Sequence, residues 1–202
     1  MNNKLAPKAV LFNGPPRCGK DSLSDGIVGC ADFKGHYREK LSFGRFPKEG
    51  AHASFGLKVR FDHYEDSKDV PSEDFLGMTP RQAYITHSEQ YMKPCYGKDV
   101  YARLMVSLIK RKLDKITIHH KPPMFMFSDI GFQEELDVLA NDVFGAENTL
   151  LVQLHRIGAD FKNDSRTYVS HPKVRSIALY NNFSLDQTLF NAIGFVKSSF
   201  SV

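Results

Sequence analysis

The chain has 202 residues, of which 42% are hydrophobic and 25% are charged. That length suits one domain with room for an inserted lobe, so we expect a single domain over 1–202. The composition is that of an ordinary globular protein, which excludes intrinsic disorder, a coiled coil and a collagen-like fibre. Lysine and arginine number 27 against 23 aspartates and glutamates, a net charge of +4. This small excess suits small anionic ligands and gives no reason to expect stable nucleic-acid binding.

The cysteines, Cys18, Cys30 and Cys95, are odd in number and form no CxxC pair. A disulfide framework or a zinc knuckle is therefore not expected, and a reducing compartment fits best. The first residues show no signal-peptide pattern, and no apolar run approaches the roughly 18 residues that a membrane helix needs. We expect a cytoplasmic protein without a membrane segment.

Short apolar runs alternate with helical patterns along the chain. In chain order, the patterns predict a strand over Lys8–Asn13, a helix over Gly19–Ala31, a short strand over Lys40–Phe43, a helix from Thr79–Pro80 to Tyr91, a helix over Lys98–Leu113, a strand over Met124–Ile130, a helix over Phe132–Phe144, a strand over Thr149–Leu154, a weaker strand over Ser176–Tyr180 and a last helix from Ser184. Such alternation indicates an α/β fold with a parallel sheet that is covered on both faces. Ligands bind such sheets at the carboxyl ends of the strands.

The most informative motif is the segment GPPRCGKDS, from Gly14 to Ser22, between the first strand and the first helix. A phosphate-binding loop requires this context. Gly14 and Gly19 allow the backbone to wrap tightly, and the amides from Arg17 onward form an anion nest with the helix N-terminus. Lys20 supplies a cation to the β and γ phosphates. The weaker alternative is a glycine-rich turn that caps a helix by chance.

The loop departs from the general pattern because Asp21 stands between the lysine and the hydroxyl residue Ser22. The hydroxyl normally ligates Mg²⁺, so either Ser22 takes that role or Asp21 reaches the ion through water. Asp129 ends the apolar run MFMFSDI, where a Mg²⁺ partner is expected; alternatively, it caps the following helix. The predicted nucleotide-binding residues are Gly14, Arg17, Cys18, Gly19, Lys20, Asp21 and Ser22, with Ser22 and Asp129 as the metal ligands.

A basic cluster from Arg156 to Arg166 follows the strand TLLVQL. Guanidinium groups pair bidentately with phosphate oxygens, so this cluster could close over a transferring phosphoryl group as part of a mobile cover. The alternative is a solvated loop in which nearby aspartates pair with the cations. The tripeptide Thr79-Pro80-Arg81 indicates a helix start, and its functional interpretation is that Arg81 faces the phosphate of an acceptor.

In this order, these segments resemble the deoxynucleoside monophosphate kinases of tailed bacteriophages, a group of the P-loop nucleoside monophosphate kinases. The resemblance covers residues 8–195 and includes the GKD loop followed by a hydroxyl residue. The other matching segments are Lys40–Lys48, Phe55–Leu57, Gly77–Arg81, Ser128–Glu134 and Asn181–Leu185. The arginine of the family's SD element is replaced here by Gly131.

The resemblance implies a three-layer P-loop fold with a central parallel sheet of about five strands flanked by helices, an acceptor-binding lobe over 58–97 and a lid over 156–172. It implies transfer of phosphate from ATP, with Mg²⁺, to a (deoxy)nucleoside monophosphate to supply DNA precursors, in the host cytoplasm if a phage encodes the chain. The implied catalytic residues are Lys20, Arg156 and Arg166, and the implied acceptor-binding residues are Arg45, Lys48 and Arg81. The sequence leaves three points open: homodimerisation, a P-loop kinase of another small phosphorylated acceptor, and a nucleotide-binding module without turnover.

Overall fold

The computed structural model describes residues 6–116, 121–162 and 164–201. The chain forms two compact units, one made of Met1–Ser42 with Met105–Val202 and the other of Phe43–Leu104. Because both ends of the second unit join the first, the second unit is an insertion in the first. The predicted acceptor-binding lobe, 58–97, is a part of this insertion.

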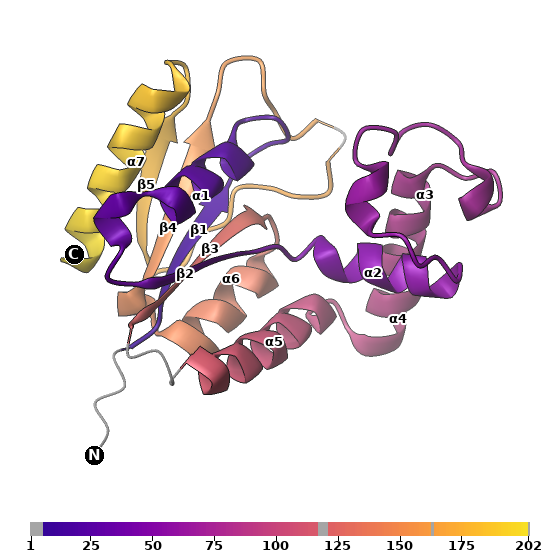
Figure 1. Ribbon diagram of the computed structural model, residues 1–202, viewed down its shortest axis with the longest axis horizontal. Coiled ribbons are helices and arrows are strands. Elements are labelled where there is room, and N and C mark those ends of the chain that lie inside the picture. The colour runs from indigo at the N-terminus through magenta and orange to yellow at the C-terminus, as the bar shows by residue number, and fades with distance from the viewer. Residues whose placement is uncertain (1–5, 117–120, 163, 202) are drawn as a thin grey trace. The chain divides into compact units, whose positions relative to one another are not determined.

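A five-stranded parallel sheet in the order β2-β3-β1-β4-β5 forms the centre of the first unit (Figure 1). Its strands are β1 (Lys8–Asn13), β2 (Tyr37–Leu41), β3 (Pro123–Ile130), β4 (Thr149–His155) and β5 (Arg175–Tyr180). The central strands are buried along nearly their whole length, as expected where helices cover both faces. The predicted α/β class is therefore confirmed. Since β1 lies between β3 and β4, the loops that follow these three strands meet at one edge of the sheet.

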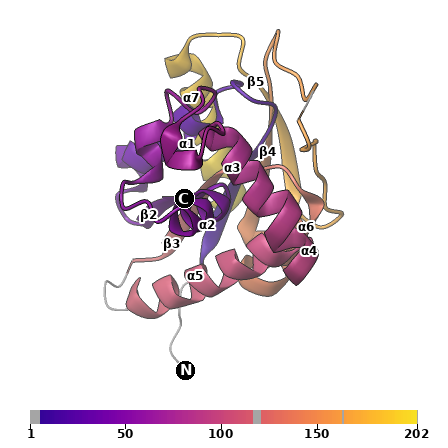
Figure 2. The same ribbon diagram turned by 90° about the vertical axis from the view of Figure 1, so that its right-hand side faces the viewer.

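Alternate strand residues face two different helical layers. Figures 1 and 2 show α1 (Lys20–Gly29) and α7 (Leu185–Phe200) on one face, and α6 (Gln133–Leu139) with the later part of α5 (Val100–Ile116) on the other. The buried core under α1 and α7 includes Val10, Phe12, Leu23, Ile27, Met124, Met126, Leu150, Val152, Ala192 and Val196. On the opposite face, the rings of Phe125 and Phe127 pack against Phe144, with centroids 6.0 and 6.1 Å away.

The inserted unit is helical. It contains α2 (Arg45–Ser54), 3-10 turns at Phe61–Tyr64 and Glu73–Phe75, α3 (Pro80–Ile85), a π-helical stretch (Thr86–Met92) and α4 (Lys93–Tyr96). Helix α3 begins at the predicted cap: the Thr79 hydroxyl accepts from the Gln82 amide at 3.1 Å, and the Gln82 side chain accepts from the Thr79 amide at 2.9 Å. This capping box satisfies two amides that a helix start leaves without partners.

The edge strand differs from its prediction. It covers Tyr37–Leu41 and not Lys40–Phe43, because the segment YREKL lies at an edge of the sheet, where charged side chains are tolerated and no apolar run marks the strand. Two of the predicted helices are α-helical only in their first part. Their later stretches, Ala140–Phe144 and Thr86–Met92, are π-helical. Short 3-10 turns lie at Ala31–Phe33 and Ala146–Asn148.

Candidate functional site

The loop between β1 and α1 folds tightly against its surroundings. A Cβ atom at Gly14 would lie 2.6 Å from the carbonyl oxygen of Leu154 and 2.9 Å from Cys18 Sγ, so a side chain does not fit there. Gly19 caps α1 with a φ of +102°, and Arg17 has a φ of 61°. Glycine adopts such left-handed values without strain. Both predicted loop glycines therefore occupy positions that require glycine, and a backbone of this kind gathers N–H groups into an anion-binding concavity.

The Lys20 side chain is buried inside this loop. Its Nζ donates hydrogen bonds to the carbonyl oxygens of Gly14 at 2.7 Å and Pro15 at 2.6 Å, and it lies 3.6 Å from Cys18 Sγ. Burial lowers the pKa of Lys20, and the positive charge of Arg166 adds to this effect against the opposing influence of Cys18. The ammonium is thus held by neutral carbonyl groups at the turn where a phosphate would bind.

Asn181 braces the loop from the far end of the chain. Its Nδ2 donates to the carbonyl oxygen of Cys18 at 2.8 Å, and its Oδ1 accepts from the Thr188 hydroxyl at 3.0 Å. The side chain of Cys18 is fully buried, and burial raises the pKa of its thiol. This role of Asn181 was not predicted from the sequence. The signal available was only an asparagine ahead of the last helix.

Asp129, one of the predicted metal ligands, lies near the carboxyl end of β3. Leu11 pairs with Phe127 and Asn13 with Ile130, so β3 has one extra residue between these pairs. A bulge of this kind re-aims side chains next to active sites. Asp129 lies in this irregular stretch, and its Oδ2 accepts from the Ser42 hydroxyl at 2.6 Å.

Asp21 and Ser22 are exposed in the first turn of α1. Lys40 Nζ lies 2.9 Å from Asp21 Oδ1 and 3.0 Å from Asp25 Oδ1. Within the described residues, no group of three or more His, Cys, Asp and Glu side chains could hold a metal ion. The hydroxyl of Ser22 and the carboxylate of Asp129 nevertheless suit Mg²⁺, which binds through one or two carboxylates plus substrate phosphates and water.

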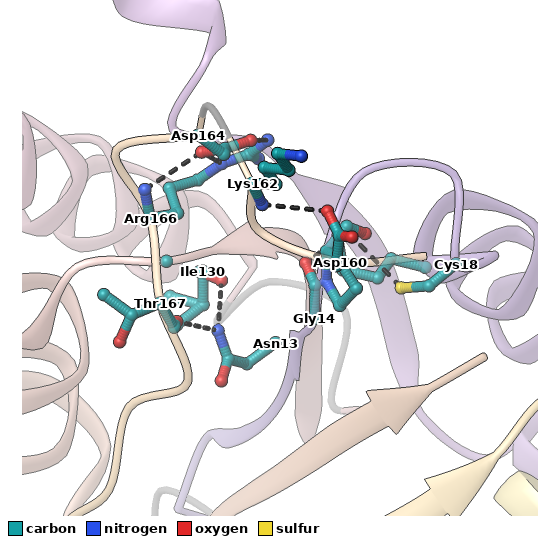
Figure 3. A network of polar contacts seen from close by, with 12 residues as sticks. Asn13, Gly14, Cys18, Ile130, Asp160, Lys162, Asp164, Arg166 and Thr167 are labelled. Carbon is teal, nitrogen blue, oxygen red and sulfur yellow. Dashed lines mark hydrogen bonds and ion pairs between the residues drawn. The ribbon is translucent and has the colours of Figure 1, made fainter. Parts of the chain in front are cut away.

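The two predicted catalytic arginines are held differently. Arg156 is exposed and donates to the carbonyl oxygen of Arg17 at 3.2 Å. Arg166 forms a bidentate pair with Asp164, with its Nε 2.9 Å from Oδ1 and its Nη2 2.6 Å from Oδ2 (Figure 3). The stem of Arg166 lies across Gly131, where a Cβ atom would be 2.7 Å from the Arg166 Cβ. The absence of a side chain at Gly131 thus makes room for the stem of Arg166.

The predicted lid, 156–172, is tied down in its second half; Asn163 lies outside the described residues. The Tyr168 hydroxyl donates to the Leu154 carbonyl oxygen at 2.9 Å. Gln153 Nε2 donates to the Val169 carbonyl oxygen at 2.8 Å. Gln133 exchanges two hydrogen bonds with the backbone of Ser170. A cover that moves over the loop would therefore be shorter than predicted.

In the second unit, each predicted acceptor-binding cation has a carboxylate partner. Arg45 lies 2.6 Å from Glu49, Lys48 lies 2.9 Å from Glu65, and Arg81 lies 2.5 Å from Asp69. Burial alone would raise the pKa of Glu65, but hydrogen bonds from Lys48 and Lys68 lower it to about 2. A phosphate that binds these cations has to compete with the carboxylates.

Of these three cations, Arg45 also lines a hollow of about 460 Å³. Lys58 and Arg60 lie in the same wall, with Glu49 as the acidic member and Phe61 as an aromatic one. Arg60 is also paired with Asp62, at 3.0 Å. Three cations against these two carboxylates leave a net positive charge, which suits an anionic ligand, and the volume falls in the range of small-molecule sites. Lys58 and Arg60 were not predicted from the sequence, because isolated basic residues in a charged stretch form no motif.

No protein-family model matches the chain, and no curated protein matches it. Among solved structures, the crystal structure of an unliganded sugar kinase from Janibacter sp. HTCC2649 is similar, with a TM-score of 0.47 and 13% identity over 95% of both chains. A likeness at this level carries no argument about activity. The sheet order β2-β3-β1-β4-β5 and the glycine loop between β1 and α1 belong to an α/β fold with a parallel sheet. Across the described ranges, no helix is long and apolar enough to cross a membrane.

Proposed function

We propose that this chain is a kinase that transfers a phosphoryl group from ATP to a (deoxy)nucleoside monophosphate. The observation that carries the proposal is the buried ammonium of Lys20 inside a glycine loop, which opens a helix at the carboxyl edge of a parallel sheet. Backbone amides, a helix N-terminus and a fixed cation together form a binding site for a nucleoside triphosphate.

The reaction requires little covalent work from the protein. A bond forms between an acceptor phosphate oxygen and the γ-phosphorus, and the bond from that phosphorus to the β–γ bridging oxygen breaks, so that ADP leaves. The acceptor oxygen is already ionised at neutral pH, so no general base is needed. Catalysis then consists of positioning and charge stabilisation. In our proposal, Lys20 and the loop amides hold the donor, and Arg156 and Arg166 neutralise the transferring group.

Ser22 and Asp129 are the proposed magnesium ligands. Ser22 is favoured over Asp21 because Lys40 already neutralises the Asp21 carboxylate at 2.9 Å. Ser22 and Asp129 would hold a magnesium ion, which would supply positive charge against the phosphates of the donor. The hydrogen bond from Ser42 to Asp129 at 2.6 Å orients the carboxylate.

The proposal also specifies the acceptor as a nucleotide. It is supported by the order of the sequence segments and by the cationic hollow of Arg45, Lys58 and Arg60 in the inserted unit. Cations bind the phosphate of such an acceptor, and an aromatic ring such as Phe61 offers a face for its base. A kinase that acts on a different phosphorylated acceptor would use the same loop, so the two are distinguished by assaying different acceptors.

The decisive test is a coupled assay of ADP release with Mg·ATP and each of the four deoxynucleoside monophosphates. Lys20→Met is the control, since it keeps the length of the stem and removes the charge. We expect release that depends on an acceptor and falls by at least about 10²-fold in the variant. ATP binding without release, for these acceptors and for other phosphomonoesters, would contradict the kinase assignment and leave a binding module.

A further inference from the structure

Asn13 is the last residue of β1, and its side chain is completely buried. Its Nδ2 donates to the carbonyl oxygen of Ile130 at 2.9 Å and to that of Thr167 at 2.9 Å (Figure 3). Its Oδ1 accepts from the amide of Val169 at 3.0 Å. The orientation of the amide is determined, because a flipped group would set its NH₂ against the Val169 N–H.

These bonds fix a stretch of backbone next to Arg166. Thr167 follows Arg166 directly, and the Thr167 amide donates to the carbonyl oxygen of Gly131 at 3.2 Å. Asn13 therefore joins the ends of β1 and β3 to both Thr167 and Val169. On the other side of Arg166, the Asp164 carboxylate holds the guanidinium in two hydrogen bonds. Figure 3 shows this segment close to the ends of both strands.

We propose that Asn13 is a positioning residue that holds Arg166 in place for phosphoryl transfer. This inference rests on the proposed function. Because the segment after Arg166 is hydrogen-bonded to the end of the central strand, the guanidinium is already in position for the transition state. No large closure of the segment is then needed to place it there. Such preorganisation is the main source of electrostatic catalysis, and a misplacement of about 1 Å can cost on the order of 10²-fold in rate.

The test is a double-mutant cycle of Asn13→Asp with Arg166→Ala, measured as kcat and KM for ATP and the acceptor. The aspartate keeps the size of the side chain and loses the NH₂ that donates to two carbonyls. We expect Asn13→Asp alone to lower kcat about ten- to hundredfold and to change either KM by less than about threefold. With alanine at position 166, the same change should lower kcat by less than about twofold more.

Gln133→Ala is the matched control, because Gln133 anchors Ser170 in the same segment but farther from Arg166. It should change kcat by less than about twofold. If the Asn13 and Arg166 effects multiply, Asn13 acts through general stability and the proposal is overturned. It is equally overturned if the Arg166 variant keeps full activity.

A second measurement is independent of activity. Hydrogen–deuterium exchange of peptides covering residues 164–170 should be faster in Asn13→Asp, because the carbonyls of Ile130 and Thr167 lose their donor. It should also be faster in Asn13→Ala, in which the Val169 amide loses its acceptor as well. Unchanged exchange in folded variants would refute the positioning role. Absence of phosphoryl transfer in the parent protein, in contrast, refutes the proposed function, and the exchange result alone then decides whether Asn13 orders the segment.

Discussion

Substituting Gly131 by alanine is the sharpest steric test of the arginine cluster. A Cβ atom there would lie 2.7 Å from the Arg166 Cβ and closer still to its Cγ and Cδ. The φ of Gly131 is not positive, so the alanine backbone is unstrained and the clash falls on Arg166 alone. To relieve the clash, the arginine stem has to move away, and the two bonds to Asp164, at 2.6 and 2.9 Å, are lost or lengthened.

Overpacking of this kind costs about 1–3 kcal/mol. In a chain of this size, each kcal/mol lowers the Tm by about 2–4 °C, so we expect a fall of roughly 2–12 °C. The displaced cation should lower kcat by about 10²-fold. Differential scanning calorimetry gives the Tm, and the coupled ADP assay gives the rate.

Gly194→Ala in α7 is the matched control, since nothing lies within 4 Å of the added Cβ. It should leave the rate unchanged and stabilise the helix by up to about 1 kcal/mol. Full activity of Gly131→Ala would refute the reasoning. So would an equal loss of rate in the Arg166→Ala background, where two of the three clashing atoms are gone.

Three further predictions concern the ion pair, the loop and the hollow. The pKa of Glu65 is lowered to about 2, below its value of about 4.3 in an unfolded chain. The ionised Glu65 therefore stabilises the folded protein above about pH 5, and this stabilisation is lost as the pH falls toward 2. Glu65→Gln should make the free energy of unfolding in urea depend less on pH over this range, and an unchanged pH dependence would contradict the prediction. Asn181→Leu removes the donor to the Cys18 carbonyl oxygen, while the Thr188 hydroxyl keeps its bond to Ser184. It should therefore lower the free energy of unfolding by about 1–3 kcal/mol and weaken ATP binding in a fluorescence titration; full affinity would rule out the bracing role. Lys58→Ala and Arg60→Ala should each raise the KM of the acceptor and leave the KM of ATP unchanged. The control Arg111→Ala, on an exposed part of α5, should raise neither KM. An equal effect of all three variants would argue against the hollow as the acceptor site.

Local pattern was sufficient to predict the central strands and the glycine loop. β1, β3 and β4 are continuous apolar runs with turns at their ends, as buried parallel strands are, and the glycines of the loop follow β1 directly. The edge strand Tyr37–Leu41 lacks this signal because its side chains are partly exposed. The π-helical stretch Thr86–Met92 was likewise not predictable, because apolar spacing does not separate i→i+5 from i→i+4 hydrogen bonding.

The side-chain network of the site depends on contacts that no local pattern encodes. Asn13 and Thr167 are 154 positions apart, and Asn181 and Cys18 are 163 apart. An asparagine at the end of a strand is usually a turn residue. The role of Asn13 as a buried hydrogen-bonding residue becomes apparent only when β1, β3 and the segment 167–169 are brought together. The carboxylate partners of Arg45 and Arg81 also become apparent only in three dimensions.

Lys20 is held differently from the cations of the inserted unit, and this difference bears on which nucleotide binds more tightly. Its ammonium is held by carbonyl oxygens, and burial together with the nearby charge of Arg166 lowers its pKa. A phosphate that binds Lys20 displaces only carbonyl dipoles, although Arg166 beside it is paired with Asp164. In the inserted unit, Arg45 and Lys48 are already neutralised by carboxylates, so an acceptor phosphate gains less charge stabilisation when it enters. The donor should therefore bind more tightly than the acceptor, and the affinity of the donor should fall more steeply than that of the acceptor when Arg166 is replaced by alanine.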